Sequence, residues 1–281
     1  MLRALTAAAA LIVAGVGVAF AAVHGEEPEE YPFSFLSPVG SYDMAAVQRG
    51  FQVYQQVCAN CHSMDHLSYR HLGESGGPFA LYMVRDHETG EMAPHIGKPA
   101  HGGTFVQVTD NPYVRAIAAG VTISDIDPNS GQPTDRPGRI SDRFRRPFPN
   151  QIAAAASNGG APPPDLSVIT SARHGGARYI RSLLMGYDGE TKGTLHHNPY
   201  FPGGWLAMAP PLAEGAVPYS DPETPQTVEQ YATDVATFLQ WAADPHMEER
   251  KRLGIVVLAF LFALAGLLYL SYKQVWRGES H

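Results

Sequence analysis

The chain has 281 residues, 44% of them hydrophobic and 17% charged, and its formal net charge is −7. The chain is acidic overall, and we expect no nucleic-acid partner. Two cysteines can form at most one disulfide, which excludes a disulfide-rich framework, and no internal repeat or long low-complexity tract is present.

The first 21 residues have the pattern of a secretory signal peptide. Met1-Leu2-Arg3 is a short positive start, the run from Ala7 to Phe20 is uncharged and apolar, and Ala19-Phe20-Ala21 has the small-x-small form of a cleavage site. We therefore predict that residues 1–21 are removed and that the rest of the chain is exported. An uncleaved N-terminal anchor is the alternative.

The exported part, residues 22–252, is long enough for one large domain. It carries 17 Lys and Arg against 26 Asp and Glu, a net charge of −9. Its sequence predicts helices separated by long ordered loops, with little strand. The first helix is amphipathic, with Ser41 or Asp43 as its N-cap. Its apolar positions follow helical spacing: Met44, Val47, Phe51, Tyr54 and Val57.

That helix leads into the motif Cys58-x-x-Cys61-His62, which holds both cysteines of the chain. On one helical turn the two thiols and the imidazole share a face, as covalent attachment of a c-type haem requires. A disulfide, a thioredoxin-like dithiol and half of a zinc site are the alternatives. A dithiol site would need a strand before the motif, and a zinc site would need more ligands nearby. The motif favours haem c.

Residues 74–110 match no motif and contain several potential metal ligands. These are His87, Met92, His95 and His101. They share no regular spacing, so a solvent-facing loop is expected rather than a metal site.

Met208 is the favoured sixth ligand of a haem iron among the eight methionines of the chain. Met64 is too close to the motif to reach the opposite face, and Met185 has the spacing of a helical core residue. Met208 lies in a loop (198–212) that four prolines stiffen, so a thioether there would lose little entropy on ligation. The alternative is a methionine that fills a gap in the core.

Residues 253–272 predict a transmembrane helix. The 18 residues from Leu253 to Leu270 carry no charge and at 1.5 Å per residue nearly cross a hydrocarbon core of roughly 30 Å. A buried core helix is the alternative. Because the domain before it is exported, this segment would stop the movement of the chain across the membrane and leave residues 273–281 as a cytoplasmic tail.

The order of motifs along the chain resembles the cytochrome c1 family, the haem c subunits of the cytochrome bc1 complex, in its bacterial form. The matching segments are VCANCHSM (57–64), YRHL (69–72), RPGRISD (136–142), PPDLS (163–167), ARHGG (172–176), NPYFPGG (198–204), AMAPPL (207–212) and TFLQWAADP (237–245). The resemblance implies a mainly α, cytochrome c-like domain with long loops and one C-terminal transmembrane helix.

The resemblance also implies the roles of individual residues. One haem c would be bound covalently through Cys58 and Cys61, with His62 and Met208 as axial ligands of the iron. Arg173 would hold a haem propionate, a task that suits a guanidinium because it binds carboxylates bidentately. The remaining implied pocket residues are Asn158, Pro163, Pro164 and Tyr179.

The implied function is electron transfer within ubiquinol:cytochrome c oxidoreductase, in a respiratory or photosynthetic chain. This subunit would accept electrons from the Rieske iron–sulfur protein beside cytochrome b, in a dimeric complex, and pass them to a soluble or anchored c-type cytochrome. It would perform no substrate chemistry of its own. It would sit in the bacterial inner membrane by a single span, with the haem domain in the periplasm. A free-standing carrier and a haem enzyme subunit are the alternatives.

The charge pattern predicts where a basic cytochrome would dock. Residues 193–249 contain no Lys or Arg but eight acids, and four more glutamates lie between residues 26 and 30. These acids flank Met208 in sequence, so we expect them to attract a basic partner. A basic cluster is expected to lie away from that face or to be paired internally: Arg136, Arg139, Arg143, Arg145 and Arg146.

Overall fold

The structure is a computed structural model that describes residues 25–278 except 87, 98 and 100–103. The predicted signal peptide, residues 1–21, lies outside the described residues. The helices are η1 (Ser34–Leu36), α2 (Met44–Gln56), η2 (Cys58–Asn60), η3 (Tyr69–Leu72), α3 (Pro112–Ala119), α4 (Gln151–Ser157), α5 (Ile169–Ala172), α6 (Ala177–Met185), α7 (Val228–Ala243) and α8 (Met247–Val275). The strands are β1 (Leu81–Arg85), β2 (Met92–Ile96), β3 (Phe105–Gln107), β4 (Thr122–Ile126), β5 (Pro133–Pro137), β6 (Thr191–Lys192), β7 (Leu195–His197) and β8 (Trp205–Leu206).

Helix α2 forms where the amphipathic spacing predicts it, and Asp43 rather than Ser41 is its N-cap. The Asp43 carboxylate accepts hydrogen bonds from the backbone N–H groups of Ala45 (3.0 Å) and Ala46 (3.2 Å), which satisfies two donors of the first turn. The helix ends one residue before Val57, and the 3₁₀ turn η2 follows. The helix thus delivers the chain to the cysteine motif.

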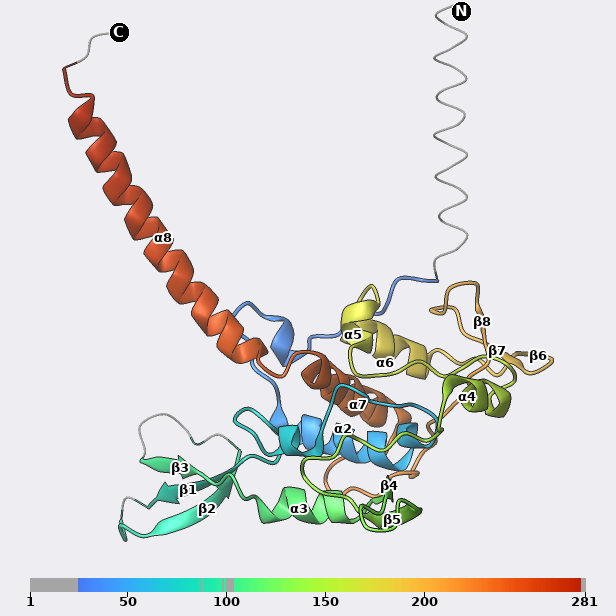
Figure 1. The fold of residues 1–281 in the computed structure, drawn as a ribbon. Coiled ribbons are helices and arrows are strands. Elements are labelled where there is room, and N and C mark those ends of the chain that lie inside the picture. The colour runs from blue at the N-terminus through green and yellow to red at the C-terminus, as the bar shows by residue number, and fades with distance from the viewer. Residues whose placement is uncertain (1–24, 87, 98, 100–103, 279–281) are drawn as a thin grey trace, which may run out of the picture.

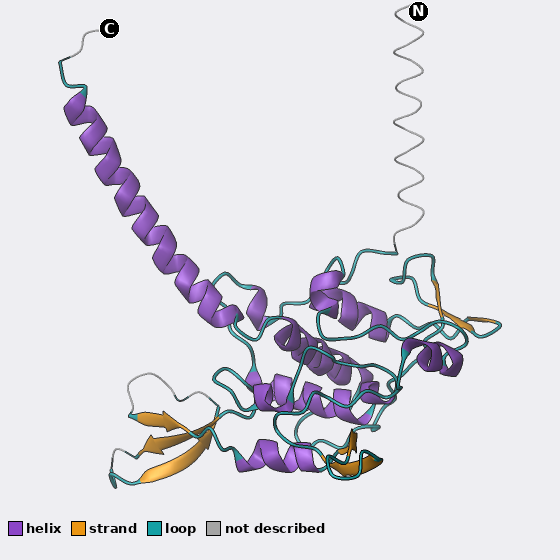
Figure 2. Ribbon diagram, viewed as in Figure 1, coloured by secondary structure: helices purple, strands orange, loops and turns teal. Residues whose placement is uncertain are grey.

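Helices α2 and α7 form the centre of the domain, and α6 packs against α7. Figures 1 and 2 show these helices side by side, with the loops and small sheets around them. The buried faces meet in one hydrophobic core, in which Val47 and Phe238 are fully enclosed. The prediction of a mainly helical domain is confirmed.

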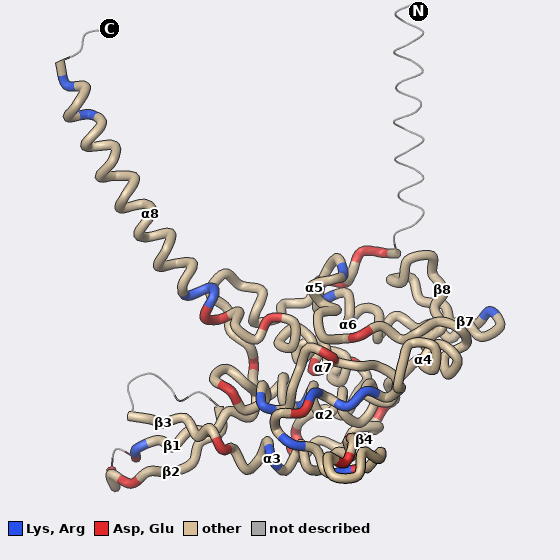
Figure 3. The backbone as a smooth tube through the Cα atoms, viewed as in Figure 1, with Lys and Arg blue, Asp and Glu red and all other residues tan. Residues whose placement is uncertain are grey.

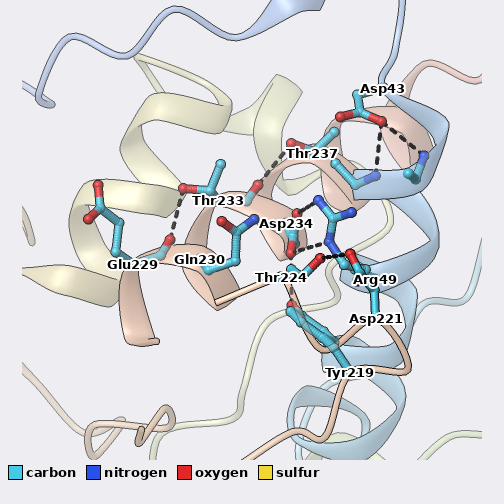
Figure 4. A network of polar contacts seen from close by, with 12 residues as sticks. Asp43, Arg49, Tyr219, Asp221, Thr224, Glu229, Gln230, Thr233, Asp234 and Thr237 are labelled. Atoms are coloured by element: carbon cyan, nitrogen blue, oxygen red, sulfur yellow. Dashed lines mark hydrogen bonds and ion pairs between the residues drawn. The ribbon is translucent and has the colours of Figure 1, made fainter. Parts of the chain in front are cut away.

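Glycine at position 50 lets α2 and α7 approach closely. A Cβ placed on Gly50 would lie 2.0 Å from the carbonyl oxygen of Asp234 in α7, so no other residue fits this contact without movement. Beside it, Arg49 binds the buried Asp234 carboxylate in two parallel hydrogen bonds of 2.9 and 2.8 Å. Tyr219 donates a third at 2.8 Å (Figure 4). The crossing is therefore fixed by both shape and charge.

The domain also contains three small antiparallel sheets, although the sequence predicts few strands. Their strand orders are β2-β1-β3, β4-β5 and β6-β7-β8. We expected a loop over residues 74–110, and this is wrong: the segment forms a sheet in which β1 pairs with β2 and β3. The expectation that this segment faces solvent is confirmed for β2, which carries Met92 and His95 and is exposed throughout. Strands this short give too few alternating residues for the pattern to be read.

Within the described residues, no group of three metal-ligating side chains includes His95. His87 and His101, the other histidines of that segment, lie outside the described residues.

Helix α8 contains the predicted span and begins six residues before it, at Met247. Its apolar part is exposed rather than packed on the domain, so the alternative of a buried core helix is wrong. Figure 3 shows the long middle of α8 without charge. The helix is long and apolar enough to cross a membrane, which fits a membrane-anchored protein.

Candidate haem site

The cysteine motif forms a single tight turn. The backbone N–H groups of Cys61 and His62 both donate to the Cys58 carbonyl, at 3.1 and 2.9 Å. The Asn60 amide donates back to the carbonyl of Gln56 at 3.1 Å, which joins the turn to the end of α2. The two cysteines and His62 therefore lie together on one turn, as the spacing predicts.

The two cysteines are free thiols in the structure. Burial, reinforced by the neighbouring Cys61, raises the pKa of the Cys58 thiol to about 12. A catalytic dithiol needs the opposite, a thiol whose pKa is lowered so that the thiolate forms at neutral pH. Among the described residues, neither cysteine belongs to a group of three metal-ligating side chains. The geometry thus disfavours the dithiol and zinc alternatives.

The ring of His62 is oriented by a hydrogen bond to a residue 102 positions further along the chain. Its Nδ1 lies 2.8 Å from the carbonyl oxygen of Pro164. A carbonyl can only accept, so Nδ1 carries the hydrogen and Nε2 keeps its lone pair. Burial lowers the pKa of His62, against the opposing effects of this bond and of Asp165. A neutral imidazole with a free Nε2 is the form that ligates iron.

Residues 164–167 are hydrogen-bonded to the segment that contains and follows His62. Ser63 donates through Oγ to Asp165 at 2.7 Å, and the backbone N–H of Asp65 donates to the same carboxylate at 2.8 Å. The N–H of Leu166 donates to the Ser63 carbonyl at 2.9 Å. Asp165 lies inside the PPDLS motif, but sequence reasoning did not identify it as a site residue. Its position after Pro163-Pro164 was the available signal.

Hydrogen bonds govern the ionisation of Asp165. Burial alone would raise the pKa of its carboxyl, but donors from Ser167, Asp65 and Ser63 outweigh burial and hold that pKa below its usual range. A carboxylate with several donors is stabilised in its charged form. Asp165 therefore stays ionised and keeps the loop attached to the motif.

Tyr187 supports the loop that carries Met208. The Tyr187 hydroxyl donates to the backbone carbonyl of Met208 at 3.0 Å, which fixes the loop next to the thioether. Burial and the nearby Tyr179 raise the pKa of Tyr187. Burial also raises the pKa of Tyr179, against a hydrogen bond from Arg173. Tyr187, which sequence reasoning missed, thus supports the backbone of Met208, whereas Arg173 acts on Tyr179.

The remaining predicted residues take part to different degrees. Pro163 and Cys61 line one cavity of about 190 Å³. The Asn158 side chain donates to the Ala161 carbonyl at 2.7 Å, so it shapes its own loop. Two thiols on one turn, an imidazole with a free Nε2 and a stiffened methionine loop fit a covalent haem c.

Comparison with known proteins agrees with this chemistry. The model of the Cytochrome C1 family matches residues 33–279. The chain is 42% identical over 267 residues to "Cytochrome c1-2, heme protein, mitochondrial" of Solanum tuberosum, covering 93% of this chain and 90% of that protein. It is 38% identical over 250 residues to "Cytochrome b-c1 complex catalytic subunit, mitochondrial" of Candida albicans, covering 87% and 75%. It is also 38% identical over 302 residues to "Cytochrome b/c1" of Bradyrhizobium diazoefficiens, covering 99% of this chain but only 39% of that protein.

Proposed function

Since the chain belongs to the cytochrome c1 family, we propose that it is the electron-transfer subunit of a cytochrome bc1 complex. It accepts one electron at a time from a Rieske iron–sulfur protein and passes it to a c-type cytochrome. The hydrogen bond from His62 Nδ1 to the Pro164 carbonyl carries the proposal, because it leaves Nε2 free for iron.

The residues of the chain hold the cofactor in three ways. Cys58 and Cys61 would attach it through thioethers, and His62 would ligate the iron. Met208 would be the second ligand, and Tyr187 holds its backbone. A haem bound in this way supplies the one-electron couple, and His/Met ligation raises its reduction potential. With His62 and Met208 as its ligands, the haem would serve electron transfer rather than the binding of small ligands.

The outer residues of the site orient these groups and exclude water. Asp165 keeps Pro164 in place and so sets the plane of the His62 ring. Arg173 stays charged and extends from an exposed position, where it would bind a haem propionate. By the family resemblance, Pro163 and Tyr179 would line the haem pocket, and Asn158 shapes the loop before Pro163. Proton transfer is not required of this subunit.

Helix α8 and the predicted signal peptide together support an arrangement in the membrane. We propose that residues 253–272 cross the bacterial inner membrane once and leave residues 22–252 in the periplasm with 273–281 inside. Cytochrome b and the Rieske protein would be neighbours in a dimeric complex. This placement agrees with attachment of haem c outside the cytoplasm.

Covalent attachment is tested by changing both thiols. Cys58→Ala with Cys61→Ala should abolish haem staining of the denatured chain on a gel, whereas Met208→Leu should leave the stain intact. Persistence of the stain in the double variant would rule out attachment at this motif.

Axial ligation by Met208 is tested by spectroscopy. Met208→Leu should remove the weak sulfur-to-iron band of the oxidised protein and lower its potential. Met185→Leu, in helix α6, is the matched control and should change neither. An unaltered band in Met208→Leu would show that another residue is the ligand.

Co-purification distinguishes a complex subunit from a free-standing carrier. From a mild detergent extract, the chain should purify together with a b-type cytochrome and an iron–sulfur protein. Cyanide or CO should leave the haem bands unchanged, whereas a haem enzyme with an exchangeable iron ligand would respond. Purification of the chain alone would contradict its place in a complex.

A further inference from the structure

Three side chains outside the proposed haem site bring potential metal ligands together. Asp188, Glu190 and His197 each offer one ligand atom, and these atoms all lie within 4.8 Å of one another. Asp188 and Glu190 belong to the turn after α6, and His197 ends strand β7. One imidazole nitrogen with two carboxylate oxygens is a ligand set suited to zinc and related divalent ions.

Contacts outside the cluster hold the histidine in place. The His197 ring packs on Trp205 of strand β8, with 5.0 Å between the ring centroids. The His197 backbone N–H donates to the Glu190 carbonyl at 2.9 Å, which holds the two segments together. Its side chain is only 29% exposed, whereas that of Asp188 is 43% exposed. The imidazole is thus already ordered before any ion binds.

The distance between the His197 and Asp188 ligand atoms is close to the distance between two ligands of one bound ion. His197 Nδ1 and Asp188 Oδ2 lie 2.6 Å apart and share a hydrogen. Two ligands about 2.0–2.1 Å from a tetrahedral zinc ion are roughly 3.3 Å apart, so the pair needs to open by less than about 1 Å. Glu190 is exposed, and its carboxylate oxygen already lies within 4.8 Å of the other two ligand atoms, so it serves as the third ligand, with water as the fourth.

We propose that Asp188, Glu190 and His197 bind one divalent transition-metal ion of the zinc class. On binding, the ion takes the place of the hydrogen between Asp188 and His197 Nδ1, and Nε2 carries the one hydrogen of the neutral imidazole after exchange with solvent. No electron is exchanged, since zinc has no redox chemistry.

The site joins the two segments that support the methionine loop. Asp188 directly follows Tyr187, whose hydroxyl holds the Met208 carbonyl at 3.0 Å. His197 packs on Trp205, which precedes Met208 by three residues. An ion between Asp188 and His197 therefore limits relative motion of both supports. This effect on iron ligation rests on the proposed role of Met208, whereas the metal site itself does not.

Zinc binding to the full chain in its detergent-solubilised complex tests the site. After treatment with a chelator, zinc chloride is titrated by calorimetry, and bound zinc is counted by elemental analysis. The unaltered chain should bind one more zinc per chain than Asp188→Asn or His197→Phe. Glu190→Gln, an exposed change that leaves the fold intact, should weaken that binding about tenfold or more.

The matched control is His196→Phe, which changes the neighbouring histidine on the other face of strand β7. It should bind zinc as the unaltered chain does. Equal zinc content in the unaltered chain and all three site variants would overturn the proposal, as would loss of zinc only in His196→Phe.

A second measurement separates the metal site from the proposed ligation. Added zinc should raise the temperature at which the sulfur-to-iron band is lost in the unaltered chain but not in His197→Phe. If zinc binds but the band does not respond, the site stands and its link to Met208 fails. If the band is absent altogether, Met208 ligation fails while the zinc count still tests the site.

Discussion

A single carboxylate, Asp165, organises the loop that orients the proposed iron ligand. It accepts hydrogen bonds from Ser63, from the backbone of Asp65 and from the backbone of Ser167, all between 2.7 and 2.8 Å. Hydrogen bonds to a charged acceptor contribute about 1.5–3 kcal/mol each when they are desolvated. The neighbouring Pro164 carbonyl then meets His62 in a fixed position. Loss of this charge would loosen the imidazole as well as the loop.

Asp165→Asn should lower the free energy of unfolding by about 2 kcal/mol at neutral pH, because the amide has one acceptor oxygen and no charge. The folded-state pKa of Asp165 lies below its usual range, so its stabilisation is present above the ordinary carboxyl pKa. It is lost as the pH falls through the lowered value. Thermal unfolding of the two proteins should therefore differ at pH 7 and converge on acidification.

Asp127→Asn is the control for this experiment, since that carboxylate is exposed and bonds within its own turn. It should leave the His62 environment unchanged. If the unfolding temperatures of Asp165→Asn and of the unaltered chain differ by the same amount from pH 7 down to acid pH, the role of the charge is contradicted.

At the scale of elements, the contact of α2 with α7 sets the position of the whole motif. The amphipathic face of α2 packs on α7, and the helix ends at Gln56, two residues before Cys58. Gly50 permits the close approach, and the pair of Arg49 with the buried Asp234 fixes the crossing (Figure 4). A shift of α2 would therefore move the attachment turn.

Gly50→Ala should destabilise the protein by about 1–3 kcal/mol, as overpacking does in a closed core. An exposed glycine in a helix would respond in the opposite way, since alanine is the better helix former by about 1 kcal/mol. Gly120→Ala is the control, because its nearest neighbours are at an ordinary 3.5 Å. Thermal unfolding of both variants measures the difference. A Gly50→Ala protein as stable as the unaltered chain would show that α2 and α7 separate freely.

At the scale of the molecule, the first turns of α8 are attached to the haem domain. The Lys251 ammonium donates to the carbonyls of Phe35 (2.6 Å) and Ser37 (2.7 Å). The Glu248 carboxylate accepts from the backbone N–H of Tyr42 at 2.9 Å. These contacts precede the apolar part of the helix, so the domain and its anchor meet at a fixed joint rather than a loose linker.

Truncation after Arg252 should release a soluble, haem-loaded domain into the periplasm. The cut keeps Lys251 and every described contact of the haem site but removes the apolar length of α8. Fractionation and haem staining measure the outcome, with the full chain as the membrane-bound control. A truncated protein that stays in the membrane after salt and carbonate washing would contradict anchoring by α8 alone.

The tertiary structure changes which acids can attract a partner. Asp234, one of the eight acids counted between residues 193 and 249, is fully buried and paired with Arg49, so its inclusion among docking charges is wrong. Glu229 is paired with Arg181 at 2.6 Å. In the basic cluster, internal pairing is confirmed for Arg136, with Asp125 and Asp142, and for Arg146, with Asp65. Exposed acids such as Glu223 remain for docking.

Electron transfer to a basic cytochrome c should slow as ionic strength rises, because charges are screened over about 10 Å at 0.1 M salt. Stopped-flow rates from low to high salt measure this. Glu223→Gln should lower the transfer rate at low salt and make the rate depend less on ionic strength. Asp127→Asn, in the exposed turn between β4 and β5, is the charge-matched control. A flat or rising rate in the unaltered chain would favour an apolar or tethered mode of docking.

Features set by near neighbours in the chain were determined by the sequence. The cap of α2 and the turn of the cysteine motif depend on contacts within four residues, and the apolar run of α8 predicts its membrane-spanning part. The order of motifs likewise identifies the family. Such features are readable because local backbone hydrogen bonds and side-chain periodicity follow directly from residue type.

Features set between distant segments were decided only by the tertiary structure. The sequence contains many acids and tyrosines, and nothing local marks Asp165 as the partner of Ser63 or Tyr187 as the support of Met208. The close contact at Gly50 and the meeting of Asp188 with His197 are equally invisible along the chain. Packing of the helices brings these segments together, and hydrogen bonding then selects one partner among many that have the same chemistry.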